Sequence, residues 1–267
     1  MRKGVRVEPG SSVDLGDFAP DARLGLDDKE QGEALAAEIG ERNAELALML
    51  GADRRRALLL ILQGMDASGK DGTVRKCIGP LNPIGVRVAA FKAPTARELA
   101  HDFLWRISRE LPERGQVGVF NRSQYEDVLI VRVESLVPES VWRPRYDAIN
   151  AFERNLVDEG TAVLKVFLNI SRDEQAERFQ ERIDDPAKHW KASAEDLAKR
   201  ERWDDYMEAY REALERTSTE WAPWHVVPAD RKWVRNVVVA ELIRDALEAM
   251  DLRWPALEPE LEGVEVR

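Results

Sequence analysis

Residues 58–73 read LLLILQGMDASGKDGT, and this stretch decides the fold. The mostly apolar run Ala57–Gln63 ends in a glycine, and Gly64 to Lys70 matches the pattern G-x-x-x-x-G-K. Between a buried strand and a helix, this pattern is typical of a P-loop, whose glycines let successive backbone N–H groups point at one phosphate. The helix N-terminus adds positive charge, and the lysine reaches the terminal phosphates. A tight turn with a chance lysine is the alternative interpretation.

Two carboxylates make this loop unusual. Asp71 stands where a metal-binding hydroxyl is expected, and Thr73 offers a hydroxyl only two positions later. We favour the interpretation that the negative charge of Asp71 only interacts with the positive end of the helix dipole, as acids in a first turn do. Asp66 lies inside the loop, where its charge repels phosphate unless a cation lies between them. We therefore expect Asp66 to contact a metal ion or to orient the attacking phosphate, with an Asx-turn as the alternative.

The rest of the chain alternates strands with helices, which predicts a three-layer α/β/α domain around a central parallel sheet. Residues 1–27 are rich in Gly, Pro, Ser and Asp, and we expect a loose arm lying over this single domain of residues 1–267. Further strands are expected at Val86–Phe91, Val117–Phe120, Ala162–Asn169 and His225–Val227. Helices are expected at Asp28–Leu50, Lys70–Ile78, Thr95–Glu110, Arg145–Val157, Ala194–Thr217 and Trp233–Met250. One more is expected to begin at Ser171, and capping-box spacing is present at Thr95 with Glu98 and at Ser171 with Glu174.

Composition narrows the classes of function. The chain of 267 residues is 44% hydrophobic and 34% charged, which is typical of a globular protein. A net charge of −10 argues against general nucleic-acid binding, although a local cluster of Arg and Lys can still hold an anionic substrate. The single cysteine, Cys77, fits a reducing cytoplasm. No apolar run is suited to a signal peptide or a membrane span, so we expect a cytoplasmic protein without a membrane partner.

Four ordered segments together resemble the family-2 polyphosphate kinases, which transfer phosphate between inorganic polyphosphate and nucleotides. They are GMDASGKDGT (64–73), VFNRSQYEDVLIVRV (119–133), RFQERIDDPAKHWKAS (178–193) and WHVVPADRKWVRN (224–236). The resemblance runs from about Asp28 to Pro255. It implies a P-loop kinase fold of the thymidylate-kinase type with a helical lid, dependence on Mg²⁺, and homodimers or homotetramers. It also implies that the acid at Asp66 is essential and that a hydroxyl after the lysine is not used.

The second segment, together with Met65, resembles the branch that phosphorylates both nucleoside mono- and diphosphates. Asn121 stands where some branches have Asp, and the acids are displaced to Glu126 and Asp127. The resemblance implies that Arg122 clamps phosphate oxygens and that Glu126 helps to hold Mg²⁺ or orients Arg122. A structural ion pair is the alternative for Arg122, and solvated helix surface is the alternative for Asp127. The sequence leaves open whether Asp66, Glu126 or Asp127 holds the metal.

Basic residues gather after the fourth predicted strand. Arg178 and Arg182 are one helical turn apart and share a face, and Lys188 and Lys191 follow the break at Pro186. With the resemblance, we expect residues of about 172–206 to form a lid that closes on a polyanion and excludes water. An ordinary salt-bridged helix is the alternative, because glutamates alternate with the arginines.

We therefore expect a polyphosphate-dependent nucleotide phosphotransferase that uses Mg²⁺ and converts AMP to ADP and ADP to ATP, with GMP and GDP as further candidate acceptors. The alternatives are an ATP-dependent nucleoside or nucleotide kinase and a non-catalytic polyphosphate or nucleotide sensor. The candidate catalytic residues are Asp66, Lys70, Arg122 and Glu126, and the candidate metal ligands are Asp66 and Glu126. The candidate phosphate- and nucleotide-binding residues are Gly64, Met65, Ala67, Ser68, Gly69, Gly72, Thr73, Asn121, Arg178, Arg182, Lys188 and Lys191.

Overall fold

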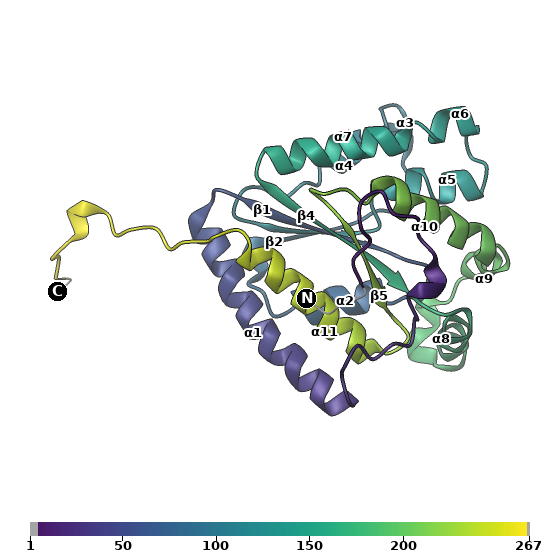
Figure 1. The fold of residues 1–267 in the computed structure, drawn as a ribbon, viewed down its shortest axis with the longest axis horizontal. Helices are drawn as coiled ribbons and strands as arrows, with labels where there is room; N and C mark the ends of the chain where they lie inside the picture. The colour runs from purple at the N-terminus through teal and green to yellow at the C-terminus, as the bar shows by residue number, and fades with distance from the viewer. Residues whose placement is uncertain (1–4, 266–267) are drawn as a thin grey trace.

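A computed structural model describes residues 5–265, which contain one sheet of five parallel strands in the order β2-β3-β1-β4-β5. The strands are β1 Ala57–Gln63, β2 Val86–Ala90, β3 Val117–Asn121, β4 Thr161–Asn169 and β5 Trp224–Pro228. Every residue of β1 is buried, because helices cover both faces of the sheet (Figure 1). The five predicted strands are all present, and their ends differ by one residue at most.

Helices α1 and α11 cover one face of the sheet, and α7 and α10 lie on the other (Figure 1), so the predicted three-layer architecture is confirmed. None of the described helices is long and apolar enough to cross a bilayer. The α-helices are α1 Lys29–Asp53, α2 Lys70–Thr73, α3 Ala96–Leu99, α4 Trp105–Ser108, α5 Ile130–Val133, α6 Glu139–Trp142, α7 Arg145–Asp158, α8 Arg172–Asp184, α9 Ala194–Glu201, α10 Trp203–Thr217 and α11 Lys232–Glu248. A π-helix continues α2 over Val74–Ile78, and 3₁₀ turns lie at Leu15–Asp17, Pro83–Gly85, Gln124–Asp127, Pro186–Lys191 and Pro259–Leu261.

The carboxyl ends of three neighbouring strands are in register. Leu62 of β1 is paired with Asn121 of β3, which is paired in turn with Ala90 of β2. Ligands of open α/β folds bind outside the carboxyl ends of the strands. The segments that follow these three strands are therefore brought side by side, although about 30 residues separate each from the next in the sequence.

The predicted helix Thr95–Glu110 is wrong in its middle. The chain forms α3, leaves the helical path, and begins α4 only at Trp105. Oδ1 of Asp102 accepts the N–H of Leu104 at 3.0 Å, a side-chain turn that competes with the helix. The predicted capping box at Thr95 and Glu98 is confirmed, with both reciprocal hydrogen bonds present.

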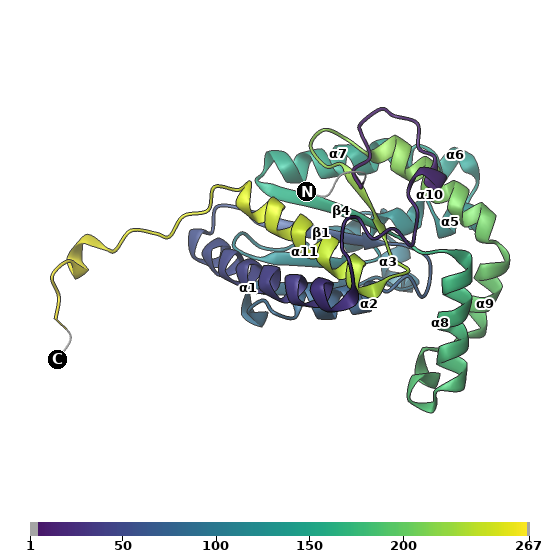
Figure 2. The same cartoon turned by 60° about the horizontal axis from the view of Figure 1, so that its bottom comes forward.

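The predicted helix Ala194–Thr217 is also divided, at Arg202, into α9 and α10. Helix α9 buries none of its residues, whereas α10 buries Trp203, Tyr206 and Tyr210 on its inner face. The change of direction lets α10 pack on the body while α9 stays with α8 in a helical projection, which Figure 2 shows extending from the body. The charge pattern of the sequence is helical throughout and does not reveal this division.

The capping box predicted at Ser171 and Glu174 is only half present. Oγ of Ser171 accepts the N–H of Glu174 at 3.1 Å. The carboxylate of Glu174 instead accepts a hydrogen bond from Arg178 at 2.7 Å, one turn further along α8. The N–H of Ser171, which the second bond of the box requires, donates to Oδ1 of Asp230 at 2.8 Å.

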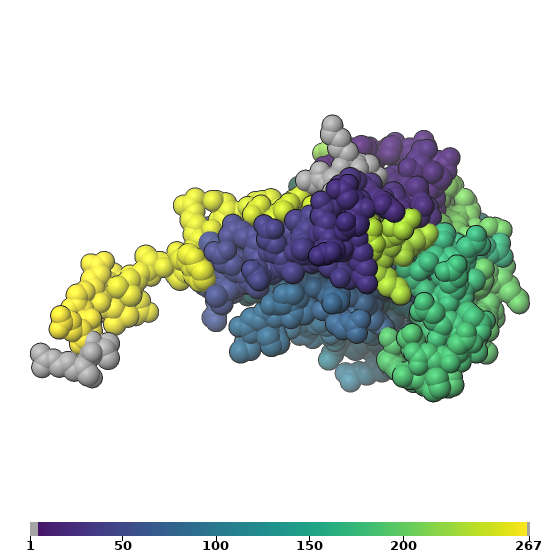
Figure 3. Space-filling view, turned by 90° about the horizontal axis from the view of Figure 1, so that it is seen from below, coloured from purple at the N-terminus to yellow at the C-terminus, as the bar shows by residue number. Residues whose placement is uncertain are grey.

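The N-terminal arm is more firmly attached than a loose arm would be. Val5 and Val7 are buried, and the N–H of Val7 donates to the carbonyl of Trp224 at 2.9 Å. The N–H of Val226 donates to the carbonyl of Val5 at 2.6 Å, so the arm covers the β5 edge of the sheet. Residues 1–4 lie outside the described part of the chain. At the other terminus, Figure 3 shows the segment after α11 extending away from the body.

Candidate active site

The loop between β1 and α2 needs glycine at two positions. Gly64 has φ of 149° and Gly69 has φ of 103°, values that side-chain-bearing residues rarely adopt. A Cβ atom at Gly64 would lie 2.8 Å from the carbonyl oxygen of Leu168, and one at Gly69 would lie 1.8 Å from Nη1 of Arg235. The glycines of the sequence pattern are therefore required by close packing around the loop as well as by its curvature.

Lys70 is folded back into its own loop. Its Nζ donates to the carbonyls of Gly64 at 2.6 Å and Met65 at 3.2 Å, and the residue is only 8% exposed. Burial lowers the pKa of Lys70 to about 8, against the opposing charge of Asp66. The ammonium is still mostly charged at neutral pH, and it lines the cleft in which a phosphate would meet it.

Asp66 and Arg122 form the central ion pair of the site. Nη2 of Arg122 donates to Oδ1 of Asp66 at 2.6 Å, with side chains 30% and 18% exposed respectively. Burial alone would raise the pKa of Asp66, but the charges of Lys70, Arg122 and Lys199 outweigh it and hold that pKa below its usual value. Asp66 is therefore ionised, and it is surrounded by cations that belong to three different parts of the chain.

Arg122 adopts a left-handed backbone conformation, with φ of 63°, directly after β3. Its N–H donates to the carbonyl of Leu62 at 3.1 Å, which ties this residue to the end of β1. Such a conformation costs a residue with a Cβ on the order of 1 kcal/mol. The strained turn directs the guanidinium back across the P-loop toward Asp66.

Arg178 holds the loop from behind. Nη1 donates to the carbonyls of Ala67 at 2.9 Å and Ser68 at 3.2 Å, and Nη2 donates to those of Ala229 at 2.7 Å and Asp230 at 2.8 Å. With Nε bonded to the Glu174 carboxylate, all five N–H donors of the guanidinium are used. The prediction that Arg178 faces a polyanion together with Arg182 therefore needs correction. Arg178 is 6% exposed and clamps the loop to the chain that follows β5.

Two further predicted loop residues point away from the cleft. The hydroxyl of Thr73 donates to the carbonyl of Gly69 at 3.1 Å, within its own helix. Ser68 is fully buried, and its N–H donates to the carbonyl of Met65 at 3.1 Å. Thr73 is therefore corrected from a candidate ligand-binding residue to a helix residue whose hydroxyl is already bonded. The side chain of Ser68 has no place in the cleft.

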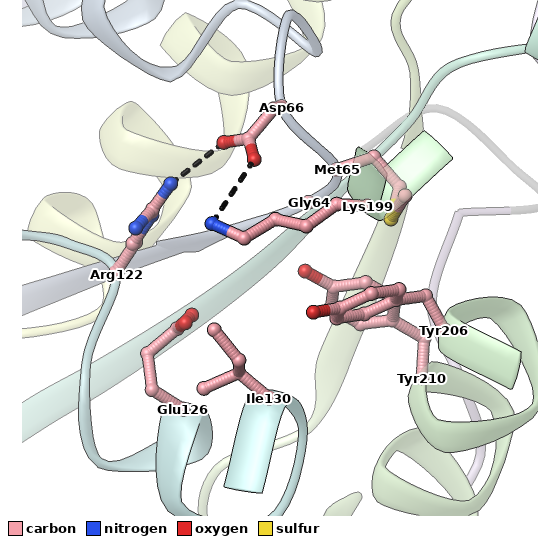
Figure 4. Close-up of a pocket in the computed structure, with 9 residues that line it drawn as sticks. All are labelled: Gly64, Met65, Asp66, Arg122, Glu126, Ile130, Lys199, Tyr206 and Tyr210. Atoms are coloured by element: carbon pink, nitrogen blue, oxygen red, sulfur yellow. Dashed lines mark hydrogen bonds and ion pairs between the residues drawn. The ribbon is translucent and has the colours of Figure 1, made fainter. Parts of the chain in front are cut away.

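A buried polar network holds the 3₁₀ turn Gln124–Asp127, which carries Glu126. The carboxylate of Glu153 accepts hydrogen bonds from Gln124 at 2.9 Å, Tyr125 at 2.8 Å and Lys165 at 2.7 Å, and all four residues are completely buried. These bonds anchor the 3₁₀ turn that carries Glu126. Figure 4 shows its carboxylate between Arg122 and Ile130, with which it lines the small cleft.

The sequence suggested two roles for Asp127, metal ligand and solvated helix surface, and its surroundings fit neither. Its carboxylate accepts a hydrogen bond from Arg145 of α7 at 3.1 Å, and its side chain is 17% exposed, so it is not solvated helix surface. Burial raises the pKa of Asp127 to about 6, although Arg145 opposes the shift. Asp127 lines neither cleft at the P-loop, whereas the other two acids considered for the metal, Asp66 and Glu126, both line the smaller one.

Two clefts open at the P-loop. The smaller, of about 30 Å³, is lined by Gly64, Met65, Asp66, Arg122, Glu126, Ile130, Lys199, Tyr206 and Tyr210 (Figure 4). The larger, of about 380 Å³, is lined by Asp66, Ala67, Gly69, Lys70, Asp71, Gly72, Ala90, Phe91, Lys92, Asn121, Arg122, Arg182, Lys191 and Asp196. A third cleft, of about 400 Å³, shares Ala90, Phe91 and Lys92 with the second and extends past Trp105 and Arg109. The ends of three strands are thus next to clefts that share lining residues.

The basic residues of the helical projection divide into two groups. Arg182 and Lys191 line the larger cleft. Arg182 is also paired with Asp196 of α9 at 3.3 Å. Lys188 instead pairs with Asp185 at 3.1 Å, is half exposed, and lines none of the clefts described here. The spacing in the sequence does not separate these two groups.

Sequence reasoning missed several residues of the site. Lys92 follows the end of β2 and could have been found by the rule that ligands meet strand ends. Tyr206 and Tyr210 are one turn apart on α10, which is the ordinary spacing of core residues. Lys199 could not be distinguished by sequence from the other charged residues of α9. Arg235, which is 3% exposed, donates from Nη1 to the carbonyl of Ser68 at 3.4 Å, and no local signal in the sequence indicates this contact.

Comparisons with known proteins agree with this geometry. The sequence model of the family described as "Polyphosphate kinase 2" matches residues 26–255. The chain is 47% identical over 264 residues to the AMP/ADP-polyphosphate phosphotransferase of Meiothermus ruber, covering 98% of each chain. It is 45% identical over 269 residues to the ADP-polyphosphate phosphotransferase of Rhodopseudomonas palustris, covering 96% of this chain and 93% of the relative. The crystal structure of polyphosphate kinase 2 from Arthrobacter aurescens matches with a TM-score of 0.93 and 49% identity, over 96% of this chain and 92% of that one.

Proposed function

This chain belongs to the polyphosphate kinase 2 family, and we propose that it transfers the terminal phosphate of inorganic polyphosphate to nucleoside mono- and diphosphates. In this proposal, one enzyme converts AMP to ADP and ADP to ATP. The observation that carries it is the Asp66–Arg122 ion pair at the mouth of a P-loop whose lysine lines the adjoining cleft. The names of the two relatives support polyphosphate as donor, and that of the Meiothermus ruber relative supports both acceptors.

Phosphoryl transfer needs positioning and charge neutralisation rather than covalent chemistry by the protein. Lys70 and Arg122 are placed to stabilise the charge that spreads over the transferring phosphate, because both are cations that line the larger cleft. Lys70 has to exchange its bonds to the carbonyls of Gly64 and Met65 for bonds to phosphate oxygens. Asp66 bonds Arg122, and its negative charge offsets the repulsion between Arg122 and Lys70 in the substrate-free site.

Mg²⁺ fits the donors that this site offers, but only with help from the substrate. Asp66 and Glu126 line the same small cleft and supply hard oxygen ligands. Within residues 5–265, no group of three or more acidic, histidine or cysteine residues could hold a metal ion alone. Enzymes of phosphoryl transfer commonly hold Mg²⁺ with one or two carboxylates and the phosphates themselves. When bound, the ion would neutralise charge on the phosphate oxygens.

We further propose that residues of about 172–206 act as the lid. Arg182 and Lys191 of this segment line the larger cleft together with the P-loop, so they are placed to meet a polyanion there. The volumes of the two larger clefts, about 380 and 400 Å³, are within the range of small-molecule sites. They support a site that holds a nucleotide beside a phosphate chain.

The test is a matrix of donors and acceptors. Purified enzyme with Mg²⁺ is offered polyphosphate or ATP as donor, and AMP, ADP, GMP or GDP as acceptor, and the product nucleotides are resolved by chromatography. We expect ADP and then ATP from polyphosphate and AMP. Turnover with ATP as donor, and none with polyphosphate, would favour an ATP-dependent kinase. Tight binding of polyphosphate without turnover would favour a sensor. Accumulation of ADP without ATP would overturn the proposal of dual acceptors but would not affect the assignment of polyphosphate as the donor.

We also propose a single domain in the cytoplasm that assembles as a homodimer or homotetramer. The assembly is part of the proposal because the family resemblance implies it. Light scattering after gel filtration measures the mass of the assembly, and a mass of one chain at micromolar concentration would contradict this part of the proposal.

A further inference from the structure

Helix α9 reaches the P-loop through one side chain. Nζ of Lys199 lies 4.0 Å from Oδ2 of Asp66, whose other oxygen is bonded by Arg122 (Figure 4). The same ammonium lies 2.7 Å from the carboxylate of Glu195, one turn earlier on α9. The Lys199 side chain is 15% exposed while that of Glu195 is 74% exposed, so the lysine is directed inward, and the glutamate lies on the solvent side.

The remaining contacts of α9 do not attach it to the loop. Asp196 pairs with Arg182 of α8, and Arg200 donates to the carbonyl of Arg172 and the side chain of Gln175, again in α8. Helix α9 buries none of its residues, so apolar packing contributes little to its position. In the described part of the chain, Lys199 is therefore the α9 residue whose charge is paired directly with the P-loop.

One electrostatic interaction between α9 and the P-loop is repulsive. Asp196 lines the larger cleft, and its pKa is raised by burial and then by the charge of Asp66. The two carboxylates carry like charges and line the same cleft, so they repel each other. Lys199, one turn from Asp196 on the same helix, supplies the compensating charge.

We infer that Lys199 is a positioning residue that holds α9 over the P-loop through Asp66 before substrate binds. The inference rests on the proposed function, because the segment it positions is the proposed lid. The ion pair orders α9 in advance, so less ordering is left to the substrate. Removing it should therefore raise KM for polyphosphate more than it lowers kcat.

Hydrogen exchange of the substrate-free protein tests this without reference to activity. In Lys199→Met, amides of a peptide covering residues 193–202 should exchange about threefold faster or more, because an ion pair of modest strength is lost. Lys199→Arg keeps the charge and should restore slow exchange. Glu195→Gln is the matched control, since it removes the partner within the helix and leaves Asp66 untouched. It should exchange like the wild type.

A double-mutant comparison assigns the effect to Asp66. Asp66→Asn should speed exchange in the same peptide, and adding Lys199→Met should produce little further change. Independent, additive effects of the two changes would overturn the inference, as would equal effects of Glu195→Gln and Lys199→Met. If the enzyme proved to use another donor, the exchange result would still stand, so this inference and the proposed function fail separately.

Discussion

Nδ2 of Asn121, at the end of β3, lies 2.6 Å from Oδ1 of Asp71, in the first turn of α2. A neutral amide thus donates to the carboxylate that stands where a P-loop ordinarily carries a hydroxyl. An aspartate at position 121 would instead place two carboxylates in contact. The residues at positions 71 and 121 are therefore linked, because each determines which partner the other can accept.

Asn121→Asp should destabilise the protein more than Asn121→Ala does. Both variants lose the hydrogen bond, but only the aspartate adds repulsion, which we expect to cost about 1 kcal/mol at neutral pH. Millimolar Mg²⁺ should remove the difference by binding between the carboxylates. Urea denaturation of both variants, with and without Mg²⁺, measures it. Equal free energies of unfolding under both conditions would contradict the linkage.

Lys70→Met should abolish transfer while leaving the fold intact. The loss of charge on the phosphates should cost about 3 kcal/mol or more, a loss of about a hundredfold or more in rate. The fold should stay intact, because the removed penalty of burying an ammonium offsets the loss of its bonds to the carbonyls of Gly64 and Met65. Steady-state rates and melting curves check both expectations, with the exposed Lys29→Met as control. Near-normal turnover would contradict the role of the loop lysine.

The lowered pKa of Lys70 predicts opposite effects of pH on stability and activity. The folded pKa is about 8 and the unfolded value is 10.5, so the unfolded chain binds more protons between these two pH values. The contribution of Lys70 to the free energy of unfolding therefore rises with pH across this window. Over the same window kcat/KM should fall, as the free enzyme loses its charge.

The wild type is compared with Lys70→Met at each pH, which isolates this group from the other titrating residues. A difference in the free energy of unfolding that stays constant from pH 8 to pH 10.5 would show that Lys70 titrates elsewhere. The alkaline limb of kcat should lie at higher pH than that of kcat/KM, because a bound polyanion favours the charged lysine.

Asp66→Asn should fold normally and fail in catalysis. The amide can replace one hydrogen bond of the carboxylate but cannot balance Lys70, Arg122 or a divalent ion. Rates are measured against Mg²⁺ concentration, with Asp71→Asn as the matched control, since Asp71 is bonded to a neutral amide. Rescue at high Mg²⁺ would assign Asp66 to the metal, and failure without rescue would assign it to the phosphates. Full activity at ordinary Mg²⁺ would return Asp66 to a purely structural turn.

Arg178→Met and Arg182→Met should separate two arginines that the sequence places on one helical face. Loss of Arg178 leaves four carbonyls around the loop without their donors and should lower the free energy of unfolding by about 2–4 kcal/mol. Loss of Arg182, which lines the cleft, should raise KM for polyphosphate with a change in stability below about 1 kcal/mol. Equal melting temperatures for both variants would contradict the clamp.

Much of the fold could be predicted because its signals are local. Periodicity, apolar runs and glycines locate the five strands to within one residue, and the spacing of the P-loop locates Lys70. The division between α9 and α10 was missed, because it depends on which side chains the body can bury and not on helical propensity. The short helices α5 and α6 were missed as well, since four residues carry too little periodicity.

The sequence by itself determined the class of loop, the order of strands and helices, and the family resemblance, because each is encoded in neighbouring residues. Only the tertiary structure decided which charges meet. Parallel pairing of β1 with β3 brings Arg122 to Asp66 across 56 residues, and the fold of the helical projection brings Lys199 to the same carboxylate. It also turned Arg178 inward and Arg182 toward the cleft, although they share a helix. A charge is defined by its residue type, but its partner is defined by distance, and distance is set by the packing of the whole chain.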